Sequence, residues 1–129
     1  MSIIYHLLLE KDYNRHLGAA TYLPDRFDED GFIHCTGDKE ALLRVANDYF
    51  LGVNERVLVL AIEAARLTAE VRFEPPAPIE GAGTSHLQGA ALFPHIYGPL
   101  NLDAVVGVGV LPMSGKAYAW PTRFPPRAR

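Results

Sequence analysis

Three histidines stand in stretches of the sequence that favour ordered structure. His6 lies in the first β-rich stretch, His34 ends the second, and His95 sits in a segment bracketed by Pro94 and Pro99. Proline restricts its own backbone and that of the residue before it, so we expect the third segment to be rigid. Imidazole groups donate and accept hydrogen bonds, so they can orient a hydroxyl or bind a phosphate. His34, His95 and His6 are therefore the candidate catalytic residues.

Strand alternation predicts which side chains share a face. Alternate residues of a strand point the same way, so His34 should face away from Cys35, and His95 should face with Tyr97. A cleft bounded by the three histidines and Tyr97 would have several donors and acceptors on an apolar floor, which is typical of a small-ligand pocket. The candidate ligand-binding residues are Tyr97, Arg72 and Thr36.

Other interpretations of the same residues remain open. Each histidine, taken singly, is more readily explained as a hydrogen-bonded structural residue, because buried imidazole always needs partners. Arg72 is flanked by Glu70 and Glu74, so it is also explained by a surface ion pair. Cys35 lacks the paired ligand spacing of a zinc site, and its opposite facing from His34 excludes a shared proton, so we expect no metal and no cysteine nucleophile.

The elements that must position these residues alternate between two periodicities without regular strand–helix repetition. The apolar run 57–62 is short and β-branched, which favours a central strand buried on both faces. A stripe of apolar residues after Thr36 or Asp38, either of which suits an N-cap, predicts an amphipathic helix that ends near Gly52. Gly107 and Gly109 mark a bend or close packing in the last strand. The expected strands are 2–9, 31–35, 56–63, 70–74 and 103–111, with a short helix over 10–17, a linker over 23–30 and a glycine-rich connection over 79–91. The fold class is α+β.

Length and charge limit the classes of function. A chain of 129 residues, 49% of them hydrophobic, has the size of one domain, and its single cysteine favours a reducing, cytoplasmic setting. Four of the 12 basic residues and none of the 15 acidic ones lie beyond Leu111. We therefore divide the chain into an acidic α+β domain, 1–111, and a basic, proline-containing tail, 112–129, expected to be frayed and solvated. An acidic body argues against nucleic-acid binding, and the uncharged stretch after Glu80 holds too many glycines and prolines for a membrane span.

Four blocks of sequence together resemble the domain of unknown function 952 family, over about residues 3–111. The blocks are 4–7 (Ile-Tyr-His-Leu), 31–36 (Gly-Phe-Ile-His-Cys-Thr), 72–76 (Arg-Phe-Glu-Pro-Pro) and 93–100 (Phe-Pro-His-Ile-Tyr-Gly-Pro-Leu). The resemblance implies a fold similar to that of ADP-ribosyltransferases, with two facing antiparallel sheets and an NAD site in the cleft between them. It also implies that His6 would fix the NAD ribose and carboxamide, and that His34 stands where those enzymes carry a tyrosine or histidine. The chain departs from them in having Leu7 where glycine commonly follows the first histidine, and His95 and Tyr97 where many have a late glutamate.

Three hypotheses of function follow. The first is an enzyme that acts on NAD or on an ADP-ribosylated or phosphorylated small substrate. The second is a binding module for NAD, ADP-ribose or a related nucleotide. The third is a structural or interaction domain whose motifs only shape the chain. The sequence does not decide among them, and it leaves the oligomeric state open.

Overall fold

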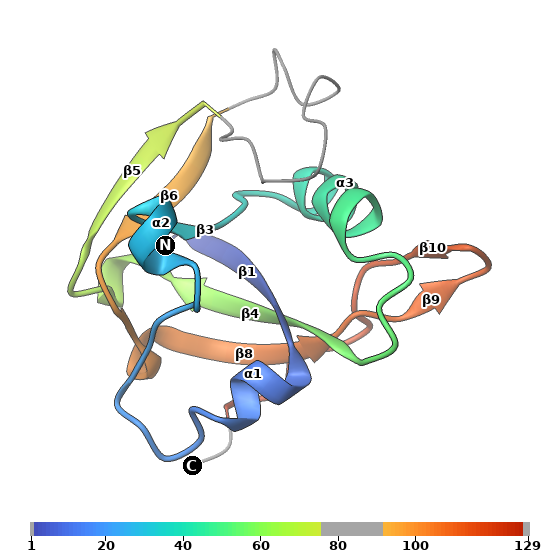
Figure 1. Cartoon of the computed structure of the whole chain (residues 1–129), viewed down its shortest axis with the longest axis horizontal. Helices are drawn as coiled ribbons and strands as arrows, with labels where there is room; N and C mark the ends of the chain where they lie inside the picture. Colours follow the sequence, from blue (N-terminus) through green and yellow to red (C-terminus); the bar gives the residue numbers. More distant parts are fainter. Residues whose placement is uncertain (1, 76–91, 128–129) are drawn as a thin grey trace.

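The computed structural model describes residues 2–75 and 92–127, and their core is two three-stranded antiparallel sheets. One has the order β1–β4–β8 and the other β3–β6–β5, with two smaller strand pairs, β2–β7 and β9–β10 (Figure 1). The strands are β1 (Ile3–Leu9), β2 (Thr21–Tyr22), β3 (Ile33–His34), β4 (Val57–Glu63), β5 (Glu70–Glu74), β6 (Phe93–Tyr97), β7 (Leu100–Asn101), β8 (Val105–Val110), β9 (Met113–Ser114) and β10 (Ala117–Tyr118). The helices are α1 (Glu10–Asn14), α2 (Phe27–Asp30) and α3 (Lys39–Tyr49), with 3₁₀ turns η1 (Ala64–Arg66) and η3 (Leu102–Ala104). This mixture confirms the α+β class.

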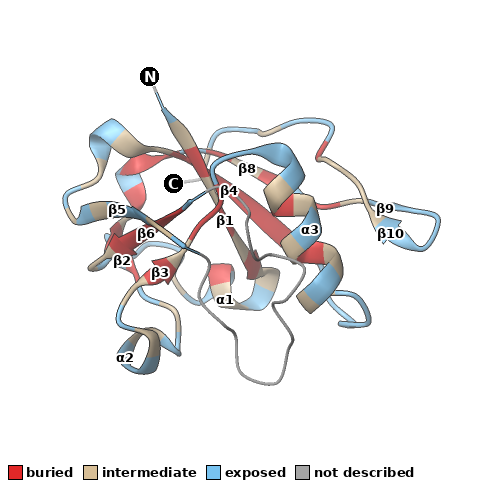
Figure 2. Ribbon diagram, turned by 90° about the horizontal axis from the view of Figure 1, so that it is seen from above, coloured by how far each residue is buried: buried red, intermediate tan, exposed pale blue. Residues whose placement is uncertain are grey.

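β4 is the central strand of the first sheet, as its composition predicts. Residues Val57 to Ile62 are all buried, because β1 and β8 cover both edges and packed side chains cover both faces. The buried segments in Figure 2 run along this sheet through the middle of the molecule. A strand that is buried on both faces is a rigid support for the neighbouring strand β1, which carries His6.

The larger hydrophobic cluster lies between the two three-stranded sheets. Ile4, Leu8 and Leu60 from the first sheet pack in one cluster with Ile33 and Ile96 from the second. Along β1 the buried positions alternate, so His6 points into the same interior as Ile4 and Leu8, as alternation predicts. The sheets therefore present apolar faces to each other, and His6 lies between them.

α3 covers the opposite side of the first sheet (Figure 1). Its N-cap is Asp38, whose carboxylate accepts a hydrogen bond from the backbone N–H of Ala41 at 2.8 Å. Leu42 and Ala46 are fully buried against Val57 and Val59 in a second cluster. The structure therefore has the amphipathic helix that the apolar stripe predicts, although the helix ends at Tyr49, about one turn before Gly52.

The two sheets are joined where β1 passes the chain after β3. The backbone N–H of Tyr5 donates to the carbonyl of Thr36 at 2.8 Å, and the N–H of Thr36 donates back to the carbonyl of Tyr5 at the same distance. This single antiparallel bridge fixes the position of residues 34–36 relative to β1.

The C-terminal segment packs on the first sheet, so the expectation of a frayed and solvated tail is wrong for the residues described. Trp120 lies edge-on to Tyr5 with ring centroids 5.1 Å apart, and Phe124 packs on both. The carbonyl of Pro125 accepts a hydrogen bond from the N–H of Val108 at 2.8 Å. The basic residues of this segment predict exposure to solvent, whereas its aromatic rings form a cluster with Tyr5.

Gly107 and Gly109 mark close packing, as the sequence indicates, and the partner is this segment. A Cβ atom at Gly109 would lie 2.9 Å from Pro121 and 3.0 Å from the Phe124 ring. A Cβ at Gly107 would lie 2.9 Å from the Phe124 carbonyl. Two glycines on one face of β8 thus make room for the tail.

Some element boundaries differ from those expected. α1 is one turn shorter than expected, and the linker over 23–30 contains the short helix α2, which ends at Gly31 with φ +83°. The glycine-rich connection and His86 lie outside the described residues. No helix within 2–75 and 92–127 has the length and apolar character needed to cross a bilayer.

Substituting Gly109→Ala should destabilise the protein by about 1–3 kcal/mol, because the new methyl group must displace Pro121 and Phe124. Urea unfolding measures the loss. Trp120, the one tryptophan of the chain, should also become more exposed, which its fluorescence reports. Gly37→Ala is the control, since a Cβ there approaches nothing closer than 3.9 Å. Equal stability of the two variants would contradict the close packing.

Candidate functional site

The candidate residues of the second sheet meet because of strand register. In the ladder, His34 of β3 stands opposite His95 of β6, and His95 stands opposite Arg72 of β5. Ile33 and Ile96 belong to the core face of this sheet, so the histidines occupy the other face. The His34 and His95 rings lie 5.7 Å apart in an edge-to-face arrangement.

His95 is held by a carboxylate that the sequence did not single out. Nδ1 of His95 lies 2.8 Å from Oε1 of Glu74, and the hydroxyl of Tyr97 donates to the same oxygen at 2.6 Å. Burial, opposed by Glu74, lowers the pKa of His95, and the two hydrogen bonds lower the pKa of Glu74. At neutral pH the pair is therefore a neutral imidazole donating from Nδ1 to an ionised carboxylate.

Arg72 lies beside this pair without entering the pocket described below. Its guanidinium stacks 4.3 Å above the Tyr97 ring and pairs with Glu70 at 3.1 Å. Both groups are exposed, so the pair adds little stability. The surface ion pair that the flanking acids suggested is thus present, together with a cation–π contact.

His34 has an acidic partner four residues before it in the sequence. Nε2 of His34 lies 2.9 Å from Oδ2 of Asp30, the last residue of α2. Phe32 stacks on His95 with ring centroids 4.0 Å apart and planes at 18°, and also contacts His34. The two histidines therefore share an aromatic neighbour, while a separate carboxylate fixes each ring.

His6 joins this group through the backbone. Its Nδ1 lies 2.7 Å from the carbonyl oxygen of His34, so Nδ1 carries the proton, and Nε2 accepts a long hydrogen bond of 3.4 Å from the hydroxyl of Tyr22. Burial lowers the pKa of His6 to about 4, so the ring is neutral at pH 7. The three histidines therefore converge, but His6 approaches His34 from the core side and meets its main chain.

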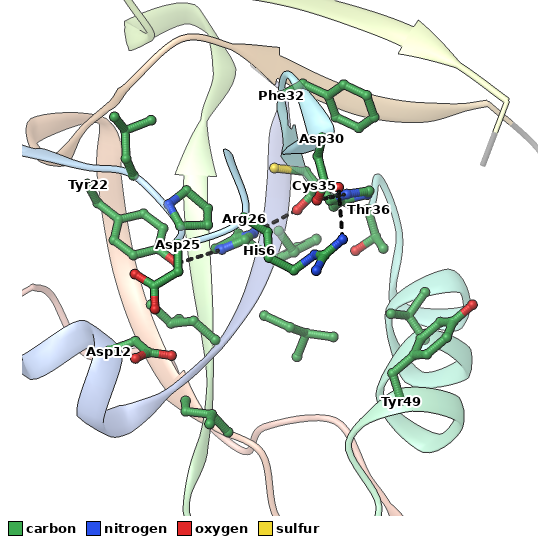
Figure 3. A pocket seen from close by; sticks show the side chains of 18 of the residues that line it. His6, Asp12, Tyr22, Asp25, Arg26, Asp30, Phe32, Cys35, Thr36 and Tyr49 are labelled. Atoms are coloured by element: carbon green, nitrogen blue, oxygen red, sulfur yellow. Dashed lines mark hydrogen bonds and ion pairs between the residues drawn. The ribbon is translucent and has the colours of Figure 1, made fainter. Parts of the chain in front are cut away.

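A pocket of about 360 Å³ lies beside these rings, between β1, the chain around Tyr22 and α3 (Figure 3). Its walls include His6, His34, His95 and Thr36, so four of the six candidates line it, whereas Tyr97 and Arg72 do not. Apolar and aromatic side chains supply most of the remaining wall, such as Leu8, Phe32 and Phe93. An apolar cavity with a few convergent polar groups is the usual form of a small-ligand site.

Thr36 contributes an unusual feature to the pocket wall. The residue is 5% exposed, and its hydroxyl oxygen is buried without a hydrogen-bond partner within the described part of the chain. An unpaired buried polar atom costs free energy, so such groups are uncommon and often mark a binding position.

The charged groups at the pocket are mostly engaged with one another. Asp12 and Asp25 pair with Arg15. Arg26 pairs with Asp30 (Figure 3). The lining therefore holds three acidic side chains, two basic ones and four histidines, His6, His16, His34 and His95. The electrostatic balance favours a ligand part that is neutral or positively charged.

The buried side chain of Cys35 also lies on the pocket wall. Cys35 is 2% exposed in the core cluster, and burial raises the pKa of its thiol, which therefore stays protonated. Within residues 2–75 and 92–127, no group of three or more His, Cys, Asp or Glu side chains is placed to hold a metal ion.

The fold and the site together define an α+β domain with a histidine-lined pocket at the junction of two sheets. The chain belongs to the family described as "Protein of unknown function (DUF952)", whose model matches residues 8–108. The family resemblance expected from the four sequence blocks is thereby confirmed.

Solved structures of one protein, CC0527 from Caulobacter crescentus, share the fold. Its X-ray structure has a TM-score of 0.72 at 24% identity, covering 91% of this chain and 92% of that chain. Its solution NMR structure has a TM-score of 0.69 at 24% identity, covering 95% and 93%. No curated protein sequence matches the chain. These comparisons establish the family and the fold, and the chemistry has to be argued from the site.

Thr36→Val should stabilise the protein by about 1 kcal/mol, because it replaces an unpaired buried hydroxyl with a methyl group of similar size. Thermal unfolding measures the gain. Thr68→Val is the matched control, since the Thr68 hydroxyl bonds to Asn101 and its removal should give no gain. A loss of stability in Thr36→Val would show that the hydroxyl has a structural partner.

Stability should fall as the pH falls from 6.5 toward 4. The unfolded chain protonates His6 near pH 6.5 and the folded chain only near pH 4, so the unfolded state binds more protons in this window. The loss attributable to His6 is about 3 kcal/mol over the window. Urea unfolding at a series of pH values should show a shallower dependence in His6→Gln, and parallel curves would contradict the burial argument.

Proposed function

We propose that the pocket binds a nucleotide of the NAD or ADP-ribose type through its ribosyl part. The observation that carries the proposal is that two histidines on the pocket wall, His34 and His95, are oriented by carboxylates. A histidine that serves only the fold is satisfied by its partners, as His6 is by the His34 carbonyl and Tyr22. Rings held by a carboxylate at one nitrogen present the rest of their edge to a ligand.

The residues present fit such a ligand in size and in chemistry. A volume of about 360 Å³ suits one ribosyl unit with its base more than a whole dinucleotide. The unpaired Thr36 hydroxyl offers a bond that the protein itself leaves unmade. Phe32 and Phe93 offer apolar surface for a ring. His34, His95 and Thr36 would hold the sugar, and the bound NAD would supply a glycosidic bond with a nicotinamide leaving group.

The electrostatics favour the nicotinamide ribose over the diphosphate. The nicotinamide ring of NAD is positively charged, and three carboxylates, those of Asp12, Asp25 and Asp30, line the pocket. The two arginines of the lining are already paired with these acids. The diphosphate would then lie toward the exposed rim. The two sheets packed around one core, which the sequence resemblance implies for an ADP-ribosyltransferase-like fold, support the same proposal.

Cleavage of the nicotinamide–ribose bond is the second candidate, and the position of Asp30 favours it. No acid occurs in the 93–99 block, but Asp30 reaches the pocket from α2. A carboxylate near the anomeric carbon would stabilise the positive charge that develops there as the leaving group departs. In a hydrolysis, water would form the new bond to the anomeric carbon as nicotinamide leaves.

The binding test uses purified protein with ADP-ribose and NAD, followed by calorimetry and thermal shift. We expect saturable binding to the wild type and about tenfold weaker binding to His34→Ala and His95→Ala, since each loses one hydrogen bond to the ligand. Arg66→Ala removes a cation outside the pocket and controls for unspecific attraction of the diphosphate. Unchanged melting temperatures across both ligands would leave the structural hypothesis in place.

Nicotinamide release from NAD separates the two candidates. Release that is lost in Asp30→Asn, with NAD still bound, identifies an enzyme. Saturable binding without any release identifies a binding module.

A further inference from the structure

Two polar atoms on the pocket wall could bond to a ligand. One is the hydroxyl oxygen of Thr36, which is buried. The other is Nε2 of His95, whose side chain is 2% exposed and whose hydrogen bond to Glu74 is made by Nδ1. Both residues line the same cavity. The buried hydroxyl of Thr36 costs free energy while it is unpaired, and a ligand that bonds to it would remove that cost.

The protonation of His95 follows from its surroundings. Glu74 and the hydroxyl of Tyr97 lie outside the pocket, and the carboxylate can only accept, so Nδ1 of His95 carries the hydrogen. The imidazole is neutral because burial disfavours its charged form. Nε2 therefore holds a lone pair, and the stacked Phe32 ring keeps the plane of the imidazole fixed.

The register places Thr36 and His95 near each other. His34 is opposite His95, and the N–H of Cys35 donates to the carbonyl of Pro94 at 3.1 Å, so the pairing continues past β3. Thr36 is two residues beyond His34 and thus diagonal to His95. Diagonal neighbours in an antiparallel pair are about 7–8 Å apart at the backbone, close enough for one ligand group to bridge their side chains.

The Thr36 hydroxyl as donor and Nε2 of His95 as acceptor restrict which chemical groups of a ligand can bond to both. A phosphate accepts hydrogen bonds but has none to donate to Nε2 at neutral pH. An ammonium group would bring a charge into a buried site where no carboxylate is the direct neighbour of both atoms. A hydroxyl donates and accepts, and two neighbouring hydroxyls of a sugar reach both atoms.

We propose that Glu74 and Tyr97 fix His95 as a hydrogen-bond acceptor and that this acceptor, together with the Thr36 hydroxyl as donor, binds neighbouring sugar hydroxyls. Glu74 and Tyr97 are positioning residues, since neither lines the pocket. The hydroxyl site rests on the proposed function, because it assigns the ribose of the ligand to these two residues. The tautomer of His95 does not depend on any ligand.

The tautomer is tested by nitrogen NMR of histidine-labelled protein above pH 7. We expect His95 to be protonated at Nδ1 and unprotonated at Nε2. Glu74→Gln should keep this tautomer, because the amide oxygen still accepts, and Glu74→Ala should populate the form protonated at Nε2. Glu70→Ala is the matched control on the same strand face, since Glu70 bonds to Arg72 and not to His95. A protonated Nε2 in the wild type, or a Glu74→Ala spectrum equal to that of the wild type, would overturn the positioning role.

The hydroxyl site is tested by the affinity for ADP-ribose and for ADP, which lacks the terminal ribose. We expect Thr36→Val and Glu74→Ala each to bind ADP-ribose about tenfold more weakly, and Thr36→Ser and Glu70→Ala to bind it like the wild type. ADP should bind weakly and equally to all variants.

The outcomes separate the two proposals. If ADP-ribose fails to bind the wild type, the proposed function and the hydroxyl site are both wrong. If it binds the wild type and all variants equally, the proposed function stands and the hydroxyl site is wrong.

Discussion

The structure depends on the place where β1 meets the chain after β3. Two backbone hydrogen bonds between Tyr5 and Thr36 and the bond from the His6 ring to the His34 carbonyl are the polar links between the two three-stranded sheets at this point. They lie in a largely buried region, where leaving a backbone group unpaired costs more free energy than a hydrogen bond contributes. The apolar packing of the sheets is tolerant of small shifts, but these bonds are directional. They therefore set the position of His34 and Thr36 on the pocket wall.

Local structure and site chemistry are linked through the second sheet. Its core face is apolar and its other face carries the histidines, so the register that buries Ile33 and Ile96 also sets His34 beside His95. A one-residue slip would send the histidines into the core, and the hydrophobic effect opposes it. Glu74 reaches His95 for the same reason, because β5 pairs with β6 along its whole length. Burial of the core thus fixes the register that places Glu74 beside His95. Glu74 in turn determines which nitrogen of the His95 ring carries the hydrogen.

The sequence predicts the elements better than their partners. The apolar run of β4, the capped helix after Asp38 and the alternation of β1 follow from local patterns, and the structure has all three. The alternation of side chains along the strands predicts that the histidines share one cleft. It shows Glu74 only as a neighbour of Arg72. The bond from Glu74 to His95 requires the register between β5 and β6. These strands are far apart in the chain, so no local sequence pattern indicates how they pair. Asp30 and His34 are four residues apart, but α2 ends at Asp30 and His34 lies in β3, so helical spacing does not predict their contact. The charges of the tail predict a solvated segment, whereas its Trp120 and Phe124 rings pack on Tyr5.

The tail also bears on the order in which the molecule is completed during synthesis. Trp120 to Pro125 follow every strand of both sheets in the chain, yet they cover β8 and the outer face of β1. On the ribosome, the two glycines of β8 therefore lack their packing partners until residues 120–125 have emerged. Until then this face of the first sheet is an open apolar surface, which is the kind of surface that chaperones bind.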